Sequence, residues 1–207
     1  MEELLSDLRG RFGDLLTQSY TRGYLRALKR QGKPIPEDIK LVDKHSLQRS
    51  ADIESAYFSN FEWRARDTMD RATNGEFTEE EALTKIQADV TRLGKTASAR
   101  LDMMGTVDAM DGDGLVYVPR IRSRDAHVCP PNDTCSELIA GRVFRVETLR
   151  NNAYANFGAP KTRWVPCVPM HPNCQHFAVP AYKKTIEELR KAGITREDIP
   201  DEGYYIG

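Results

Sequence analysis

The 207-residue chain has 40% hydrophobic and 29% charged residues, the composition of an ordinary soluble protein. Its net charge of −1 argues against a nucleic-acid coat protein or a membrane-surface binder, and it has no run of about eighteen apolar residues of the kind that spans a membrane. Its first residues are acidic and amphipathic, unlike a secretory signal, so we expect an intracellular protein with reduced cysteines.

A helix is predicted near the N-terminus, because apolar residues recur there at steps of three and four. They are Leu5, Leu8, Phe12, Leu15, Leu16, Tyr20, Tyr24 and Leu28. Gly23 weakens this helix without ending it, whereas Gly32 and Pro34 are expected to end it. A second stripe predicts a second helix that stops at Gly75, and its apolar residues are Ile53, Tyr57, Phe61, Ala65, Met69 and Ala72.

A third helix is predicted to begin with a capping box, in which Thr78 and Glu81 each satisfy a free backbone amide. Its apolar stripe consists of Leu83, Ile86, Val90, Leu93, Ala97, Leu101, Met104 and Val107. About thirty residues at about 1.5 Å each give a helix on the order of 45 Å long. Because a small core does not need such a length, we interpret residues 1–113 as a helical arm or bundle that spans between larger bodies.

The sequence pattern changes at residues 110–114, where aspartates alternate with glycines. A calcium loop would need an acidic ligand twelve residues along, where the sequence has Arg122 or Ser123, so a tight turn is the stronger interpretation. The apolar run at residues 115–118 then predicts a strand. We place a domain boundary at this turn and expect an α+β protein, with a small zinc-stapled second domain over residues 114–207.

The C-terminal end of the second domain predicts one more helix. Thr185 and Glu188 have the spacing of a second capping box, and Gly193 is expected to close the short helix that follows. The apolar tail at residues 203–207 is expected to fold back on its own domain rather than to dock onto a partner.

Metal-capable side chains are concentrated in one quarter of the chain. Seven of the eight Cys and His residues lie between residues 127 and 176, namely His127, Cys129, Cys135, Cys167, His171, Cys174 and His176. Zinc takes about four such ligands, and two close pairs on two loops supply them with little strain. We predict that the ligands are Cys129, Cys135, His171 and Cys174, with His176 and Cys167 as alternates. Two other interpretations stay open: buried packing cysteines, or a Cys129–Cys135 disulfide.

The predicted zinc is structural rather than catalytic. A catalytic zinc keeps a position open for water and has an acid or base nearby. The sequence contains neither His-Glu-x-x-His nor the deaminase signature, and the segment 127–176 and its flank hold few acidic residues: Asp125, Asp133, Glu137 and Glu147. We therefore assign no catalytic residue, no organic cofactor and no small-molecule substrate.

The same segment resembles the phage Mu F-type head morphogenesis family of minor head proteins. The resemblance rests on the stretch from Arg124 to Cys129, on the stretch from Cys135 through Gly141 to Val143-Phe144, and on the ending His171-Pro-Asn-Cys174-Gln-His176. The sequence departs from the family pattern in its wider first cysteine pair and in its closing Gln-His in place of Arg-Cys. The resemblance implies a low-copy structural protein of the virion that associates with the portal protein, and with the capsid, during head assembly, DNA packaging or ejection.

Charge adds one further candidate contact. Residues 114–184 carry 10 Lys and Arg against 4 Asp and Glu, a balance of +6. Within them Arg120, Arg122 and Arg124 alternate along an extended stretch and so project from one face, where they could meet DNA phosphate, an acidic portal surface or only solvent. Two other functions are weighed against the head protein: a zinc-dependent nuclease or toxin-like enzyme that would use Glu137 or Glu147, and a regulatory nucleic-acid-binding zinc module.

Overall fold

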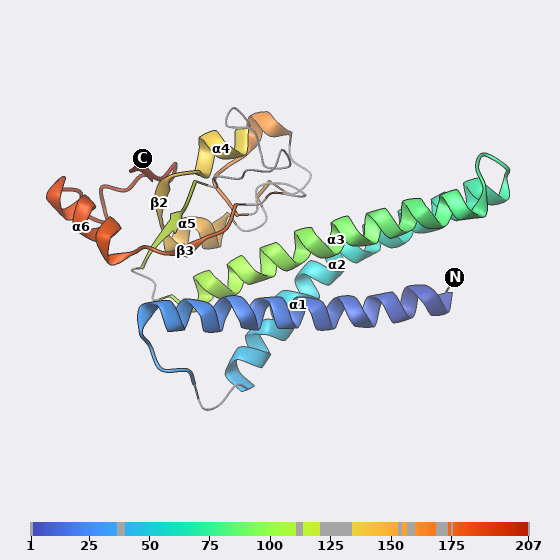
Figure 1. Cartoon of the computed structure of the whole chain (residues 1–207), viewed down its shortest axis with the longest axis horizontal. Coiled ribbons are helices and arrows are strands. Elements are labelled where there is room, and N and C mark those ends of the chain that lie inside the picture. The colour runs from blue at the N-terminus through green and yellow to red at the C-terminus, as the bar shows by residue number, and fades with distance from the viewer. Residues whose placement is uncertain are drawn as a thin grey trace.

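The computed structural model combines three long helices with a smaller domain of short helices and strands (Figure 1). It describes residues 2–36, 40–110, 114–120, 134–152, 155–156, 160–168, 174 and 176–206, with the side chains at positions 4, 40–46, 50, 52–54 and 56 left out. The expected α+β class is confirmed. Among the described residues, no helix combines the length and hydrophobicity that a membrane span requires.

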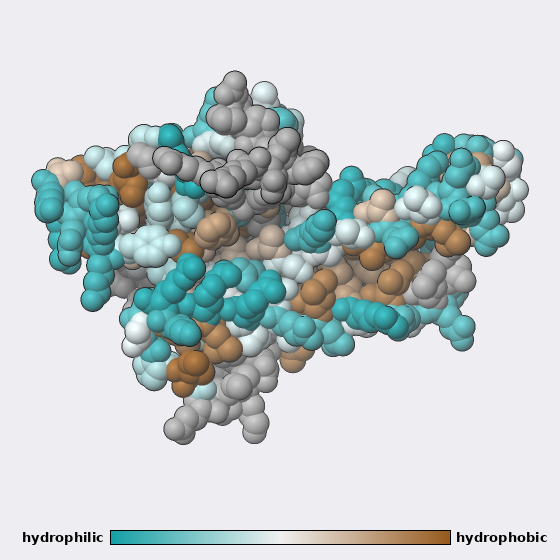
Figure 2. All heavy atoms as spheres, in the orientation of Figure 1, coloured by the Kyte–Doolittle hydropathy of each residue, from teal (hydrophilic) through white to brown (hydrophobic). Residues whose placement is uncertain are grey.

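The three long helices form a bundle, which was one of the two arrangements expected. They are α1 (Glu2–Gln31), α2 (Lys40–Thr73) and α3 (Glu79–Asp108). The α2–α3 hairpin extends beyond the start of α1 (Figure 1). Most of the predicted apolar stripes are buried, although Leu15 and Leu83 stay exposed. Figure 2 shows apolar side chains gathered along the seam between α1 and the α2–α3 hairpin, with hydrophilic surface on both sides.

Two glycines allow α1 and α3 to touch backbone to backbone. A side chain at Gly23 of α1 would overlap the backbone of Asp102, and one at Gly105 of α3 would overlap the backbone of Tyr20. The hydroxyl of Thr106 bridges the crossing, 3.4 Å from the carbonyl oxygen of Gly23. Each glycine lowers the intrinsic stability of its own helix, but its missing side chain lets the two helices pack closely.

Two aspartates of α3 bind polar side chains of other elements. The carboxylate of Asp102 accepts hydrogen bonds from Arg22, at 3.1 Å, and from Arg26, both on α1. Nearer the C-terminal end of α3, Asp108 accepts from the Tyr20 hydroxyl at 3.0 Å and forms ion pairs with Arg49 of α2 and Arg150 of the second domain. Asp108 thus joins all three long helices to the domain that follows. Burial is the largest cause that raises the pKa of Tyr20, and the neighbouring Asp108 carboxylate adds to it.

The predicted capping box at the start of α3 is confirmed. The amide of Glu81 donates to the Thr78 hydroxyl oxygen at 3.2 Å, and the Glu81 carboxylate accepts from the Thr78 amide at 2.8 Å. These bonds from Thr78 hold the pKa of Glu81 below its usual value. Because the folded pKa is depressed, this contribution to stability is present above the ordinary carboxyl pKa and is lost as the pH falls through the folded one.

Thr78→Ala should lower the free energy of unfolding by about 1 kcal/mol, because the Glu81 amide loses its acceptor and the Glu81 carboxylate loses the bond from the Thr78 hydroxyl. The matched control is Thr84→Ala. Thr84 is an exposed threonine of the same helix, and its hydroxyl donates a hydrogen bond to the carbonyl oxygen of Glu80, one turn earlier. Urea unfolding monitored by circular dichroism should show a lower midpoint for Thr78→Ala and little change for Thr84→Ala. Equal midpoints for the two variants would contradict the role of the cap.

The second domain is built on a four-stranded antiparallel sheet of strand order β3-β1-β2-β4. The strands are β1 (Leu115–Val118), β2 (Arg142–Arg145), β3 (Val179–Pro180) and β4 (Tyr204–Tyr205), and the strand predicted at residues 115–118 is confirmed. Val116 lies opposite Phe144 on the face that joins the main core, while Val143 packs on the other face with residues of the C-terminal segment. Helices α4 (Thr134–Ile139) and α5 (Val146–Asn151) and the 3-10 turn η1 (Lys161–Arg163) complete this part.

The last helix, α6 (Lys183–Lys191), corrects the second predicted capping box. The helix begins two residues before Thr185, with Tyr182 at the N-cap position and no side-chain cap bond, and Thr185 is buried inside it. Gly193, with φ of 71°, follows the helix end as expected. The tail also folds back as predicted, because Tyr204 and Tyr205 pair with Val143 and Arg142 of β2.

The helical bundle and the second domain share one hydrophobic core. Residues from all three long helices, from β1 and β2 and from the cysteine-bearing segments belong to a single buried cluster. The boundary between residues 113 and 114 remains a prediction, since the turn over residues 111–113 that carries the calcium-loop alternative lies outside the described residues. The shared core holds the second domain against α1 and α3.

Candidate metal centre

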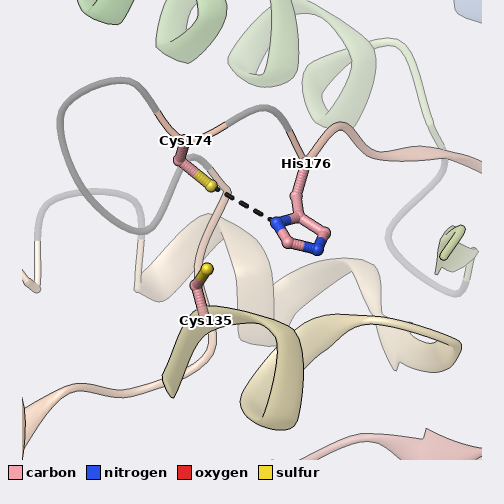
Figure 3. Close-up of side chains that lie close together, drawn as sticks. All are labelled: Cys135, Cys174 and His176. Carbon is pink, nitrogen blue, oxygen red and sulfur yellow. Dashed lines mark hydrogen bonds between the residues drawn. The ribbon is translucent and has the colours of Figure 1, made fainter. Parts of the chain in front are cut away.

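Three metal-capable side chains from two separate parts of the second domain meet in its interior (Figure 3). Cys135 lies in the first turn of α4, and Cys174 and His176 lie in the segment before β3. All three are buried, with exposed fractions of 0%, 6% and 4%. Their ligand atoms lie within 4.8 Å of one another.

The local chain geometry explains why these three side chains converge. Cys174 and His176 both point toward the Cys135 side chain of α4 (Figure 3). The helix presents Cys135 and Ile139, four residues apart, on its buried face. The group is therefore formed by the segment before β3 and by one face of a short helix.

The spacing of the donor atoms suits a single metal ion. The Cys174 Sγ atom lies 3.6 Å from His176 Nδ1. Zn–S and Zn–N bonds of about 2.3 and 2.0 Å at a tetrahedral angle would place such a pair roughly 3.5 Å apart. Two sulfur atoms and one imidazole are soft or borderline donors, of the kind that transition metals prefer and that calcium and magnesium do not. Cys135, Cys174 and His176 are thus close enough, and of the right chemistry, to bind a metal ion.

The structure brings together part of the predicted ligand set. Cys135 and Cys174, both predicted ligands, belong to the group, and the alternate His176 joins them. The other two predicted ligands, Cys129 and His171, lie outside the described residues, as does His127. The signal for His176 in the sequence was its place at the end of the motif, where the resembling family has a cysteine and this chain keeps a metal-capable side chain.

The alternate ligand Cys167 lies outside the group of three. Its Sγ atom accepts a hydrogen bond from Asn156 Nδ2 at 3.1 Å, and the same amide holds the backbone of Val165 with two further bonds. Burial is the main cause that raises the pKa of the Cys167 thiol to about 11. The hydrogen bond from Asn156 thus gives this sulfur atom a protein partner apart from the group of three. No disulfide links any two of the described cysteines.

The two glutamates considered for an enzymatic role lie outside the group of three. Glu137 is exposed on α4, and Glu147 of α5 accepts a hydrogen bond from Arg196 at 2.5 Å and has Arg145 3.8 Å away. Of the three alternating arginines, Arg120 is described, whereas Arg122 and Arg124 are outside the described residues.

The chain was compared with protein-family models, curated proteins and solved structures, and none of them matches. The likeness to minor head proteins therefore rests on the sequence motif quoted above.

Proposed function

We propose that this chain is a minor structural protein of a tailed-phage head, in which one structural zinc ion staples the C-terminal domain and the helical bundle contacts the portal vertex. The observation that carries the proposal is the buried Cys135–Cys174–His176 group. It falls on residues that belong to the motif resembling the head morphogenesis family.

Zinc is the metal that the donor set favours. Structural zinc sites use cysteine and histidine in a closed tetrahedral shell, whereas catalytic sites keep one position open to water. All three described donors are buried, with Cys135 fully inaccessible, which favours a closed site. An ion held there would join α4 to a segment about forty residues later in the chain, so its binding free energy would contribute directly to folding.

The shape of the molecule supports an adaptor role. The α2–α3 hairpin reaches beyond α1 and away from the second domain (Figure 1). Trp63 of α2, 67% exposed, is the most exposed of the large apolar side chains described on the helical bundle, and we take it as the contact residue to test. A long helical body tied to a compact stapled domain gives two separate contact regions, as a protein between a portal and a capsid requires.

The test is assembly with the portal protein encoded by the same phage genome. The full chain is co-expressed with a tagged portal protein, and the portal ring is purified and analysed by mass spectrometry. We expect the chain to stay with the ring in a fixed ratio. Trp63→Ala should weaken the association, whereas Leu83→Ala, which removes a less exposed apolar side chain near the hairpin tip, should weaken it less.

Two outcomes separate the parts of the proposal. A folded, metal-loaded chain that is absent from both purified portal rings and assembled heads would overturn the head-protein role and leave the metal site standing. Metal-dependent cleavage of DNA by the purified chain, abolished in Glu147→Gln, would instead favour the enzyme alternative.

A further inference from the structure

Two arginines of the second domain stack on one tyrosine at the rim of the sheet. The guanidinium carbon of Arg120 lies 5.0 Å, and that of Arg142 5.9 Å, from the centre of the Tyr205 ring. Arg120 also donates a hydrogen bond to the Tyr205 hydroxyl. Arg142 donates to the backbone carbonyl oxygens of Glu202 at 3.3 Å and Gly203 at 3.1 Å. We name these three residues the Arg–Tyr–Arg cluster.

The register of the sheet produces this cluster. Arg142 lies opposite both Val118 of β1 and Tyr205 of β4. Arg120 follows Val118 by two residues, so continued alternation puts it on the same face. On this face the side chains along the chain are Val116, Val118 and then Arg120, so the face changes from apolar to positively charged at the end of β1. Backbone pairing, rather than flexible side chains alone, holds the two positive charges near each other.

Among the described residues, carboxylates pair with other arginines of this domain but not with these two. Arg145 pairs with Asp201, Arg150 with Asp108, and Arg196 with Glu147. No carboxylate in the described part of the chain forms an ion pair with Arg120 or Arg142, whose contacts are the tyrosine and backbone carbonyls. Two cations that share one ring and have no carboxylate partner in the described part of the chain repel each other, and an anion that contacts both would relieve the repulsion.

We infer that the Arg–Tyr–Arg cluster binds the phosphodiester backbone of DNA without regard to sequence. Arg120 is exposed and its planar guanidinium can donate to phosphate oxygens, whereas Arg142 has Nη1 bonded to backbone carbonyls and Nε buried, so it adds its positive charge and its Nη2 group. A nucleic-acid strand offers one phosphate every ~3.4 Å along its axis, so two guanidiniums on one ring can contact phosphates of the same strand. Both arginines belong to the sequence segment 114–184, whose balance of +6 makes it the basic part of the chain. This inference depends neither on the metal site nor on the head-protein role.

The test measures binding of the full chain to a short fluorescent DNA duplex by anisotropy over a range of salt concentrations. The double variant Arg120→Gln with Arg142→Gln should bind on the order of tenfold more weakly at low salt, and the slope of log K against log salt should decrease by about two. Tyr205→Leu, which removes the ring that positions both guanidiniums, should also weaken binding. Thermal melting of each variant confirms that the fold is kept.

The matched control is Arg11→Gln with Arg92→Gln. It changes the net charge equally, but these exposed arginines already pair with Asp7 and Asp89 on the helical bundle. The control should bind DNA as the unmodified chain does. Equal loss in both double variants, or no loss in either, would overturn the inference. Competition by polyglutamate as effective as that by DNA would also overturn it and assign the cluster to an acidic protein surface.

Discussion

Removing the metal from the purified chain is expected to lower its thermal midpoint by about 10–20 °C. A structural zinc site supplies folding free energy directly, and a loss of about 5 kcal/mol corresponds to a shift of this size in a domain of 150–250 residues. Elemental analysis should first find one zinc ion per chain. Treatment with a strong chelator should then lower the midpoint, and added zinc should restore it.

Substitutions test which residues bind the ion. Cys135→Ser, Cys174→Ser and His176→Ala should each reduce the bound zinc well below one per chain, because each removes a donor from the buried group. The matched control is Cys167→Ser, which changes a cysteine that is equally buried but engaged with Asn156. That variant should keep its zinc even if it is less stable.

Acid should release the metal, because the thiolates and the imidazole must lose their protons to bind it.

Zinc content that stays unchanged in Cys174→Ser and His176→Ala would place any bound ion elsewhere. The absence of metal from unmodified protein purified without chelators would remove the stapled-domain proposal altogether.

Gly105→Ala is expected to destabilise the chain by roughly 2–4 kcal/mol. The new methyl group would overlap the backbone of Tyr20, and a backbone cannot move aside as a flexible side chain can. The two helices would have to separate, which would stretch the contact between Thr106 and Gly23 and disturb the Asp102 ion pairs.

Gly94→Ala is the matched control and should have the opposite sign. It lies in the same helix, and its nearest neighbour would be the Leu15 Cδ2 atom at 3.6 Å, an ordinary contact distance. Replacing a glycine inside a helix then stabilises by about 0.5–1 kcal/mol, because alanine loses less backbone entropy. Chemical unfolding of both variants measures the difference, and two stabilising substitutions would refute close backbone packing at the crossing.

Local patterns in the sequence were enough to predict most of the helical part. The apolar steps from Leu5 onward, the glycine-proline stop after α1 and the Thr78–Glu81 box depend only on neighbouring residues, and all are confirmed. The same reasoning was wrong at Thr185, because burial of that side chain outweighed its preference for a cap. The metal-capable segment could be located for a similar reason, since clustering along the chain is itself a local property.

Contacts between distant segments were decided by the tertiary structure. Gly23 was read from the sequence only as a weak point in a helix, whereas the crossing with α3 shows that its missing side chain is what allows contact. His176 meets Cys135 because the segment before β3 lies against α4, and Arg142 meets Tyr205 through strand register. The amino-acid order determined the three long helices, the first strand and the cysteine-rich stretch through short-range patterns. Which side chains meet depended on how helices and strands pack, because one-dimensional spacing does not specify a three-dimensional register.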